Sequence, residues 1–141
     1  MIFVEGGSKR QREVTYKAVQ FAWAELMPRI KNCVINVELK RLKGYDGTCL
    51  DIGNREYQIE INKKLSLGDD FFTTIFHEMV HVKQYVRKEL FSDVNFYKTR
   101  EEYLNLPWEI EAYKMQEVLL ERWDNLKTTN NRKRNFIGVS F

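Results

Sequence analysis

The stretch HEMVH at residues 77–81 is the feature that most constrains how this chain folds. It contains the only two histidines in the sequence, His77 and His81, with Glu78 between them. On an α-helix, residues four apart lie on one face, about 6 Å from each other. Two imidazoles at this spacing can bind one Zn²⁺ ion, and Glu78 is near enough to reach a water molecule beside it. If the motif is a metal site, residues 77–81 must therefore be helical.

The residues around HEMVH favour such a helix. Ser66 is a candidate N-cap, and Asp69 and Asp70 place negative charge in the first turn. Apolar side chains recur at helical spacing, which predicts a helix from about residue 70 to about residue 89. Its apolar side consists of Phe72, Ile75, Phe76, Met79, Val80 and Val86. An alternative stays open, in which the histidines are ordinary polar groups of an amphipathic helix and the motif is accidental.

Further helices and strands are predicted on both sides of this helix. Helical spacing predicts a helix within residues 10–30 that ends at Pro28, and another from Pro107 to about Leu126. Alternating apolar and polar residues predict strands at 33–40, near 48–52 and at 57–62, joined by short turns. Consecutive strands joined in this way are usually antiparallel. We therefore expect an α+β fold, with a three-stranded, mostly antiparallel sheet packed with an N-terminal helix, the HEMVH helix and a C-terminal helix.

Length and composition set the outer limits. The 141 residues predict one domain, which we place at 1–126, with a tail at 127–141 that either docks or frays. A net charge of +3 is too small to indicate nucleic-acid binding. Because the N-terminus lacks an apolar signal core and no apolar run approaches the ~18 residues of a membrane span, we expect a cytoplasmic protein without membrane contact. The sequence gives no indication of the oligomeric state.

A catalytic zinc ion needs a third protein ligand, and no histidine remains to supply it. Cys33 and Cys49 lie in strand or turn segments without a surrounding motif, so a carboxylate is the better candidate. The stretch PWEIEAY at 107–113 offers Glu109 and Glu111. These two lie about 200° apart around a helix, so both cannot face one metal ion. Glu109 lies closer to the apolar stripe of Ala112 and is favoured, while a solvated acidic first turn remains the alternative for both.

The motif HEMVH, followed by Glu109 in an E-x-x-A pattern, resembles the gluzincin zinc metallopeptidases, the thermolysin-like clan, and especially their minimal single-domain members. The resemblance covers roughly residues 10–125 in element order, and its specific part is these two short motifs. It implies a zinc-dependent peptidase with one Zn²⁺ ion on His77, His81 and Glu109, and with Glu78 as general base. It also implies an extended peptide or unfolded protein substrate. The strand that resembles the clan's substrate-pairing edge strand contains Tyr57, Gln58, Ile59, Glu60 and Ile61.

Two positions depart from the pattern of this clan. Tyr113 stands four residues after Glu109, where many members carry Asp or Asn to orient a zinc-bound histidine. The clan's transition-state histidine is also missing, which leaves Tyr85, Tyr103 and Tyr113 as candidates for its role. These departures leave a second interpretation open: a zinc-binding regulatory or interaction module with little or no proteolytic turnover. Gln84 is interpreted as an exposed residue or as a substrate contact.

Overall fold

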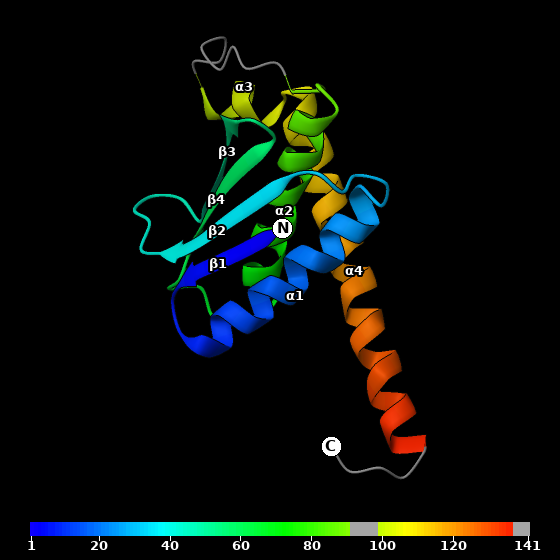
Figure 1. Cartoon of the computed structure of the whole chain (residues 1–141). Coiled ribbons are helices and arrows are strands. Elements are labelled where there is room, and N and C mark those ends of the chain that lie inside the picture. The colour runs from blue at the N-terminus through cyan, green and yellow to red at the C-terminus, as the bar shows by residue number, and fades with distance from the viewer. Residues whose placement is uncertain (91–98, 137–141) are drawn as a thin grey trace.

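The computed structural model describes residues 1–90 and 99–136, and side chains up to residue 129. Four strands and four helices occur in these residues (Figure 1). Their order is β1 (Ile2–Gly6), α1 (Lys9–Leu26), β2 (Val34–Lys40), β3 (Gly47–Gly53), β4 (Glu56–Asn62), α2 (Asp69–Val86), α3 (Arg100–Leu104) and α4 (Pro107–Phe136). The prediction of an α+β fold is therefore confirmed.

The sheet differs from the prediction in strand number and in direction. It has four strands in the order β1-β2-β4-β3. β1, β2 and β4 are parallel to one another, and only β3 is antiparallel, to β4. The five-residue β1 was not expected, and it changes the topology because α1 then connects two neighbouring parallel strands in a β-α-β unit.

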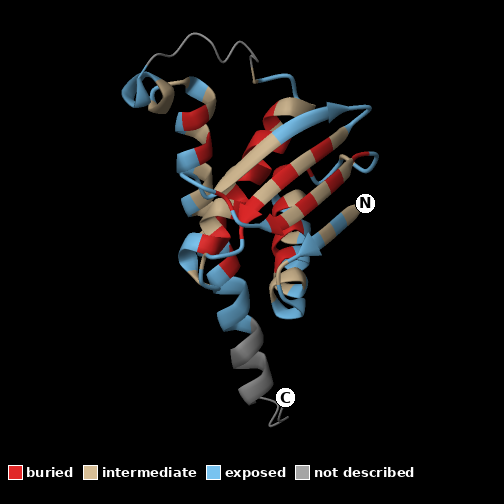
Figure 2. Cartoon of the chain, turned by 90° about the vertical axis from the view of Figure 1, so that its left-hand side faces the viewer, coloured by how far each residue is buried: buried red, intermediate tan, exposed pale blue. Residues whose placement is uncertain are grey.

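Core packing explains why β4 is central and β3 lies at the edge. The side chains of Tyr57, Ile59 and Ile61 on β4 are all buried against the helices, and burial alternates along the central strands (Figure 2). On β3 none of the residues is buried. A strand that buries three large apolar side chains is stabilised when it has a neighbour on both sides. β3 buries no side chain, so it loses little apolar burial by lying at the edge. The opposite face of the sheet stays open, with Phe3 and Leu50 exposed.

This arrangement corrects the predicted substrate strand. Residues Tyr57–Ile61 pair with β2 on one side and with β3 on the other. Their backbone N–H and C=O groups are therefore already used in the sheet, and a peptide cannot add to β4. Among the described residues, no strand pairs with the outer edge of β3, which lies beside α2.

The starts of the helices reflect their capping residues. Ser8 and Gln11 form a capping box at the start of α1, in which each side chain bonds the backbone N–H of the other residue. The N-cap of α2 is Gly68, which makes no side-chain bond, so the prediction of Ser66 as N-cap is wrong. The helix itself covers residues 69–86, close to the predicted range.

α4 continues ten residues past its predicted end at Leu126 and extends beyond the rest of the molecule (Figure 1). No proline or glycine interrupts residues 127–136, so nothing in the backbone ends the helix there. The first ten residues of the predicted tail are therefore helical. The last five, 137–141, lie outside the described residues.

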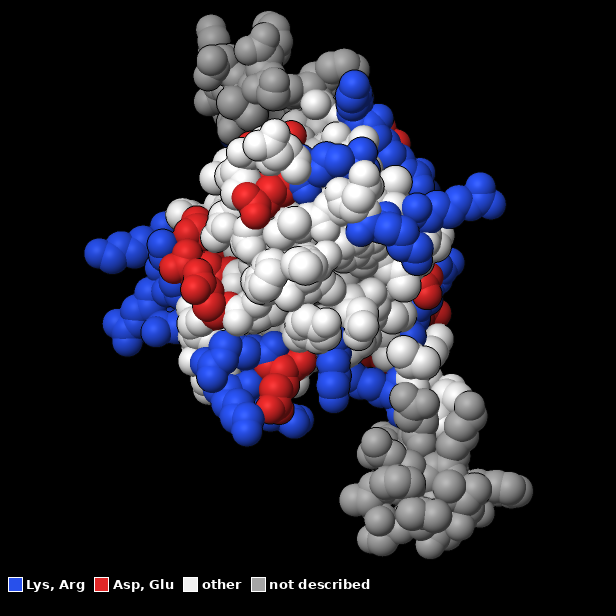
Figure 3. Space-filling model, in the orientation of Figure 1, with Lys and Arg blue, Asp and Glu red and all other residues white. Residues whose placement is uncertain are grey.

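No helix in residues 1–90 or 99–136 is long and apolar enough to cross a membrane. On the face shown in Figure 3, Lys and Arg side chains form separate groups around a largely uncharged centre. The described Lys and Arg side chains on this face do not join into one continuous basic patch.

Candidate metal site

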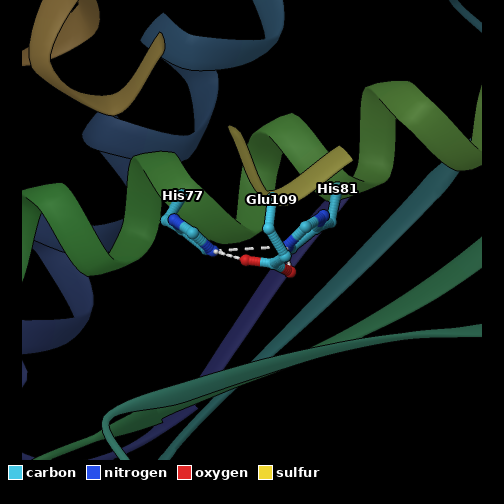
Figure 4. Close-up of side chains that lie close together, drawn as sticks. All are labelled: His77, His81 and Glu109. Atoms are coloured by element: carbon cyan, nitrogen blue, oxygen red, sulfur yellow. Dashed lines mark hydrogen bonds and ion pairs between the residues drawn. The ribbon is translucent and has the colours of Figure 1, made fainter. Parts of the chain in front are cut away.

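Three predicted ligands meet where α2 packs against the first turn of α4 (Figure 4). His77 and His81 come from successive turns of α2, and Glu109 reaches them from α4. The Nε2 atoms of the two histidines are 3.2 Å apart. The carboxylate of Glu109 lies 3.2 Å from His77 Nε2 and 2.9 Å from His81 Nε2. The three residues are close enough to bind one metal ion.

Gln84 and Gln116 determine which ring nitrogen each histidine directs toward Glu109. Gln84 Oε1 lies 2.7 Å from His81 Nδ1, and Gln116 Oε1 lies 2.8 Å from His77 Nδ1. The amide nitrogen of Gln84 donates to the carbonyl of Trp108 and to Glu111, and that of Gln116 donates to Glu117. Since these partners only accept, the amide oxygens must face the histidines. Each Nδ1 then carries hydrogen, and each Nε2 presents a lone pair to Glu109.

This donor set fits a small divalent cation. Lone pairs on two nitrogens and one carboxylate face the same point and repel one another unless a positive charge lies among them. Tetrahedral zinc with bonds of roughly 2.0–2.1 Å separates neighbouring ligand atoms by roughly 3.3–3.4 Å. The observed separations of 2.9–3.2 Å are close to this value. Two imidazoles and one carboxylate suit zinc, and they also suit other first-row metals.

The pKa values of Glu109 and His81 also indicate that the cluster favours a positive charge. Burial alone would raise the pKa of Glu109. When a proton rather than a metal ion lies between Nε2 and the carboxylate, hydrogen bonds from His77 and His81 outweigh burial and lower that pKa to about 2. For His81, burial opposes the charged form, yet the hydrogen bond with Glu109 and the charge of Glu78 raise its pKa. Glu109 therefore remains a carboxylate throughout the physiological pH range.

Glu78 lies beside the cluster without belonging to it. Its side chain is buried and makes no hydrogen bond with another described residue. Burial raises its pKa, although His81 and His77 partly offset this effect. Gly47 of β3 makes room for it, because a Cβ atom there would lie 3.1 Å from Glu78 Oε2 and 2.8 Å from Thr74 Cγ2. A buried carboxylate of raised pKa and free lone pairs can accept a proton from a water molecule.

A cleft of about 380 Å³ gives access to His77 and Glu78. The loop before β3 forms one wall, with Tyr45 and Asp46. The other walls come from α2, α3 and α4 and include Thr73, Thr74, Arg100, Tyr103, Tyr113 and Gln116. The cleft is wide enough for a peptide side chain, and polar groups predominate in its lining.

The three tyrosines occupy different places. The hydroxyl of Tyr103 donates to Glu109 Oε1 at 2.9 Å, and burial together with the charge of Glu109 raises its pKa. Tyr113 packs its ring against His77, with centroids 4.6 Å apart, and is 43% exposed in the cleft. Tyr85 stacks on Tyr57 and does not line the cleft. The position of Tyr85 therefore does not favour a role at the reacting atoms.

Glu111 does not contact the histidines, and Gln84 is not exposed as the sequence had suggested. Glu111 turns away from the histidines and pairs with Lys83 at 2.9 Å, so Glu109 is the carboxylate that meets the cluster. Gln84 is fully buried rather than exposed, and it connects Glu111 to His81. Gln116 was not considered from the sequence. The available signal was its position seven residues after Glu109, on the same face of the helix.

Comparison of the chain with models of known protein families gives no match, and neither the curated proteins nor the solved structures give one. The chemistry of the site is therefore inferred from its geometry and from the resemblance of its two motifs.

Proposed function

We propose that this protein is a zinc-dependent peptidase of the gluzincin type, which hydrolyses peptide bonds with Glu78 as general base. The observation that carries the proposal is the convergence of His77, His81 and Glu109 beside the buried carboxylate of Glu78, which makes no hydrogen bond within residues 1–90 and 99–129. Three ligands and one open position are the arrangement of catalytic zinc sites, whereas structural sites use four protein ligands. The cleft leaves this side of the cluster accessible.

Each residue of the site has a separate role in the proposed reaction. A zinc ion held by the three ligands would supply Lewis acidity, which makes a water molecule more acidic and polarises a carbonyl group. Glu78 accepts the proton of the attacking water and returns it to the leaving amine. The raised pKa of Glu78 suits both steps, because the group must gain and lose a proton near neutral pH. Gln84 and Gln116 keep both imidazoles in the tautomer that binds metal.

The substrate would be an extended peptide that pairs with β3. The outer edge of this strand has no strand neighbour in residues 1–90 and 99–136, and the first residue of the strand, Gly47, lines the cleft beside Glu78. A peptide that adds to this edge gains backbone hydrogen bonds and reaches the cleft with its chain extended. We therefore assign to β3 the role that the sequence had suggested for β4.

A comparison of four variants tests the proposal. Zinc content and cleavage of an unfolded protein are measured for wild type, Glu78→Gln, His81→Ala, Glu109→Ala and the control Glu121→Gln on the exposed side of α4. We expect about one zinc ion per chain in wild type, Glu78→Gln and Glu121→Gln. Cleavage should disappear in Glu78→Gln, and both properties should disappear in the two ligand variants. Cleavage that persists in Glu78→Gln would contradict the assigned base.

A second function is supported by the prior use of the histidines and of the Tyr103 hydroxyl in the cluster. Both histidines are used in the ligand cluster, and the Tyr103 hydroxyl is bonded to Glu109, so neither group is free to bind a developing oxyanion. A chain that binds zinc without turnover would act as a metal-binding interaction module. The variants separate the two functions, since this module would bind zinc in wild type and Glu78→Gln alike and cleave nothing in either.

A further inference from the structure

A second hollow lies away from the cleft, where α1 and α4 diverge. It has a volume of about 760 Å³, and none of the three metal ligands lines it. Its floor is aromatic: the ring of Trp123 on α4 lies 5.3 Å from that of Phe21 on α1 and 5.4 Å from that of Phe72 on α2. We call this hollow the α1–α4 groove. Its size and aromatic floor are those of a binding site, but it is open rather than enclosed.

One stripe of α1 runs along the groove. The stripe contains Arg10, Val14, Lys17, Phe21 and Ala24. The steps between these residues are four, three, four and three, which is the spacing of the contact positions in a coiled coil. The stripe borders the core-facing side of α1, because Val14 and Phe21 are partly buried against the core while Arg10, Lys17 and Ala24 are exposed. α1 therefore presents to the groove a surface with the spacing against which a second helix packs.

The rim of the groove is positively charged. Arg10, Lys17 and Lys127 line it, and no Asp or Glu does. None of the three forms an ion pair with another residue in the part of the chain that the structure describes. Lys127 Nζ lies 4.4 Å from the ring centroid of Phe72 and 5.0 Å from that of Trp123. An occupant of the groove must therefore combine apolar side chains with carboxylates.

Apolar groups at the edge of the groove remain uncovered. Leu67 and Leu126 are 41% and 45% exposed, and both line it. The indole Nε1 of Trp123 is buried and has no hydrogen-bond partner among the described residues. From Leu126 onward α4 extends past the body of the protein (Figure 1), although most helices depend on tertiary packing for their stability. A helix in the groove would cover these leucines and could continue along the extension of α4.

We propose that the α1–α4 groove binds an amphipathic helix of a partner protein, with carboxylates opposite Arg10 and Lys17. These two cations are one heptad apart, so the matching acidic residues of the partner should also be seven apart. The coiled-coil spacing and the open shape favour a helix over a fatty acid, which is normally enclosed. The chain's own C-terminal residues include Arg132, Lys133 and Arg134, which have the same charge sign as the rim. Charge repulsion therefore disfavours this segment as the occupant of the groove. This proposal is independent of the proposed peptidase activity.

Two designed peptides of about three heptads test the proposal. They share a leucine seam and differ only in carrying Glu or Lys at two positions one heptad apart. Binding of the labelled peptides to the full chain is measured by fluorescence anisotropy. We expect the Glu peptide to bind at least about tenfold more tightly than the Lys peptide, and the double variant Arg10→Glu/Lys17→Glu to reverse this preference. Absence of binding, or a preference that the double variant leaves unchanged, would overturn the proposal.

The control variant Lys43→Glu/Lys64→Glu makes the same change of net charge at exposed positions outside the groove. It should keep the preference of wild type for the Glu peptide. Circular dichroism shows whether each variant is folded. Sedimentation identifies another occupant: a dimer of wild type that dissociates in Arg10→Glu/Lys17→Glu would assign the groove to a second copy of the chain instead. Displacement of the peptide by dodecanoate at lower concentration than by unlabelled peptide would assign it to a fatty acid.

Discussion

Gln84 determines which nitrogen of His81 faces the metal site. Its amide is fully buried, and its NH₂ group is held by two acceptors, so its oxygen has one partner left, His81 Nδ1. The exchange of a hydrogen-bonded glutamine for an apolar residue of similar size would leave the Nδ1–H group of His81 buried and unpaired. The imidazole would then be free to rotate or to change tautomer. Such outer partners of a metal-bound histidine typically contribute 10–100-fold to metal affinity.

We therefore expect Gln84→Leu to bind zinc about 10–100-fold more weakly than wild type. Competition with a chelator of known affinity measures this change. The matched variant Gln116→Leu removes the corresponding bond to His77 and should have a similar effect, smaller because Gln116 is only half-buried. Unchanged affinity in both variants would show that the two amides do not orient the ligands.

Gly47 keeps the space in which the Glu78 carboxylate lies. An added methyl group would press on the side chains of Thr74 and Glu78, which must shift by a few tenths of an ångström or more. If Glu78 is the base, a small displacement is costly to the reaction but has little effect on the ligands.

We expect Gly47→Ala to lower kcat for peptide cleavage by about tenfold to a hundredfold while zinc affinity stays close to that of wild type. Gly68→Ala is the matched control, because nothing lies within 4 Å of the added carbon there. Steady-state kinetics on one unfolded substrate compare the two. A parallel loss of zinc affinity in Gly47→Ala would mean that the substitution distorts the ligand cluster rather than the base.

The individual helices and strands differ in how far their sequences determine them. α1 and α2 were predicted within a few residues, because each carries a long apolar stripe at helical spacing. β1 was missed because five residues give too short a pattern, and its place beside β2 depends on the crossover of α1. The order of β3 and β4 was missed because turns between consecutive strands say nothing about which strand lies at the edge. That choice depends on the side chains that each strand buries.

The capping box of α1 supports a stability prediction. Ser8→Ala removes the acceptor for the backbone N–H of Gln11, and we expect it to lower the free energy of unfolding by about 1 kcal/mol. Ser66→Ala is the control, because the N-cap of α2 is Gly68 and, among the described residues, Ser66 makes no hydrogen bond to its first turn. Urea unfolding followed by circular dichroism measures both. Equal destabilisation by the two substitutions would contradict the observed start of α2.

Across the whole molecule, the sequence predicted the candidate metal site better than it predicted the sheet. HEMVH places two ligands by local helix geometry alone, and Glu109 needed only the assumption that the next long helix packs against it. The glutamines, Gly47 and the outer edge of β3 depend on contacts between distant segments, which no local spacing reveals. The cleft and the α1–α4 groove likewise arise only when α4 is placed against α1 and α2.

If the cluster binds zinc as proposed, the metal and the proton compete for it, and global stability should report that competition. In the metal-free protein the raised pKa of His81 means that its proton stabilises the fold below the ordinary histidine pKa. That contribution is lost as the pH rises through the raised pKa of the folded state. Zinc binding requires neutral imidazoles, so the contribution of the metal changes in the opposite direction and is lost as the pH falls. The contribution of His81 to the stability of the metal-free fold is therefore smallest at the pH where zinc would bind best.

We accordingly expect the rise in Tm on adding zinc to be large at about pH 8 and to shrink strongly at about pH 5.5. With free zinc at about a hundredfold above its Kd, the stabilisation at the higher pH should be about 2.7 kcal/mol. Thermal unfolding in zinc buffer and in chelator measures the difference at each pH. Glu109→Gln removes the negative ligand, which is also the partner that favours the proton on His81. This variant should therefore flatten the pH dependence of Tm for both the zinc-bound and the metal-free protein. A rise in Tm that is the same at both pH values would mean that zinc stabilises the protein without displacing a proton from His81, and would place the metal at another site.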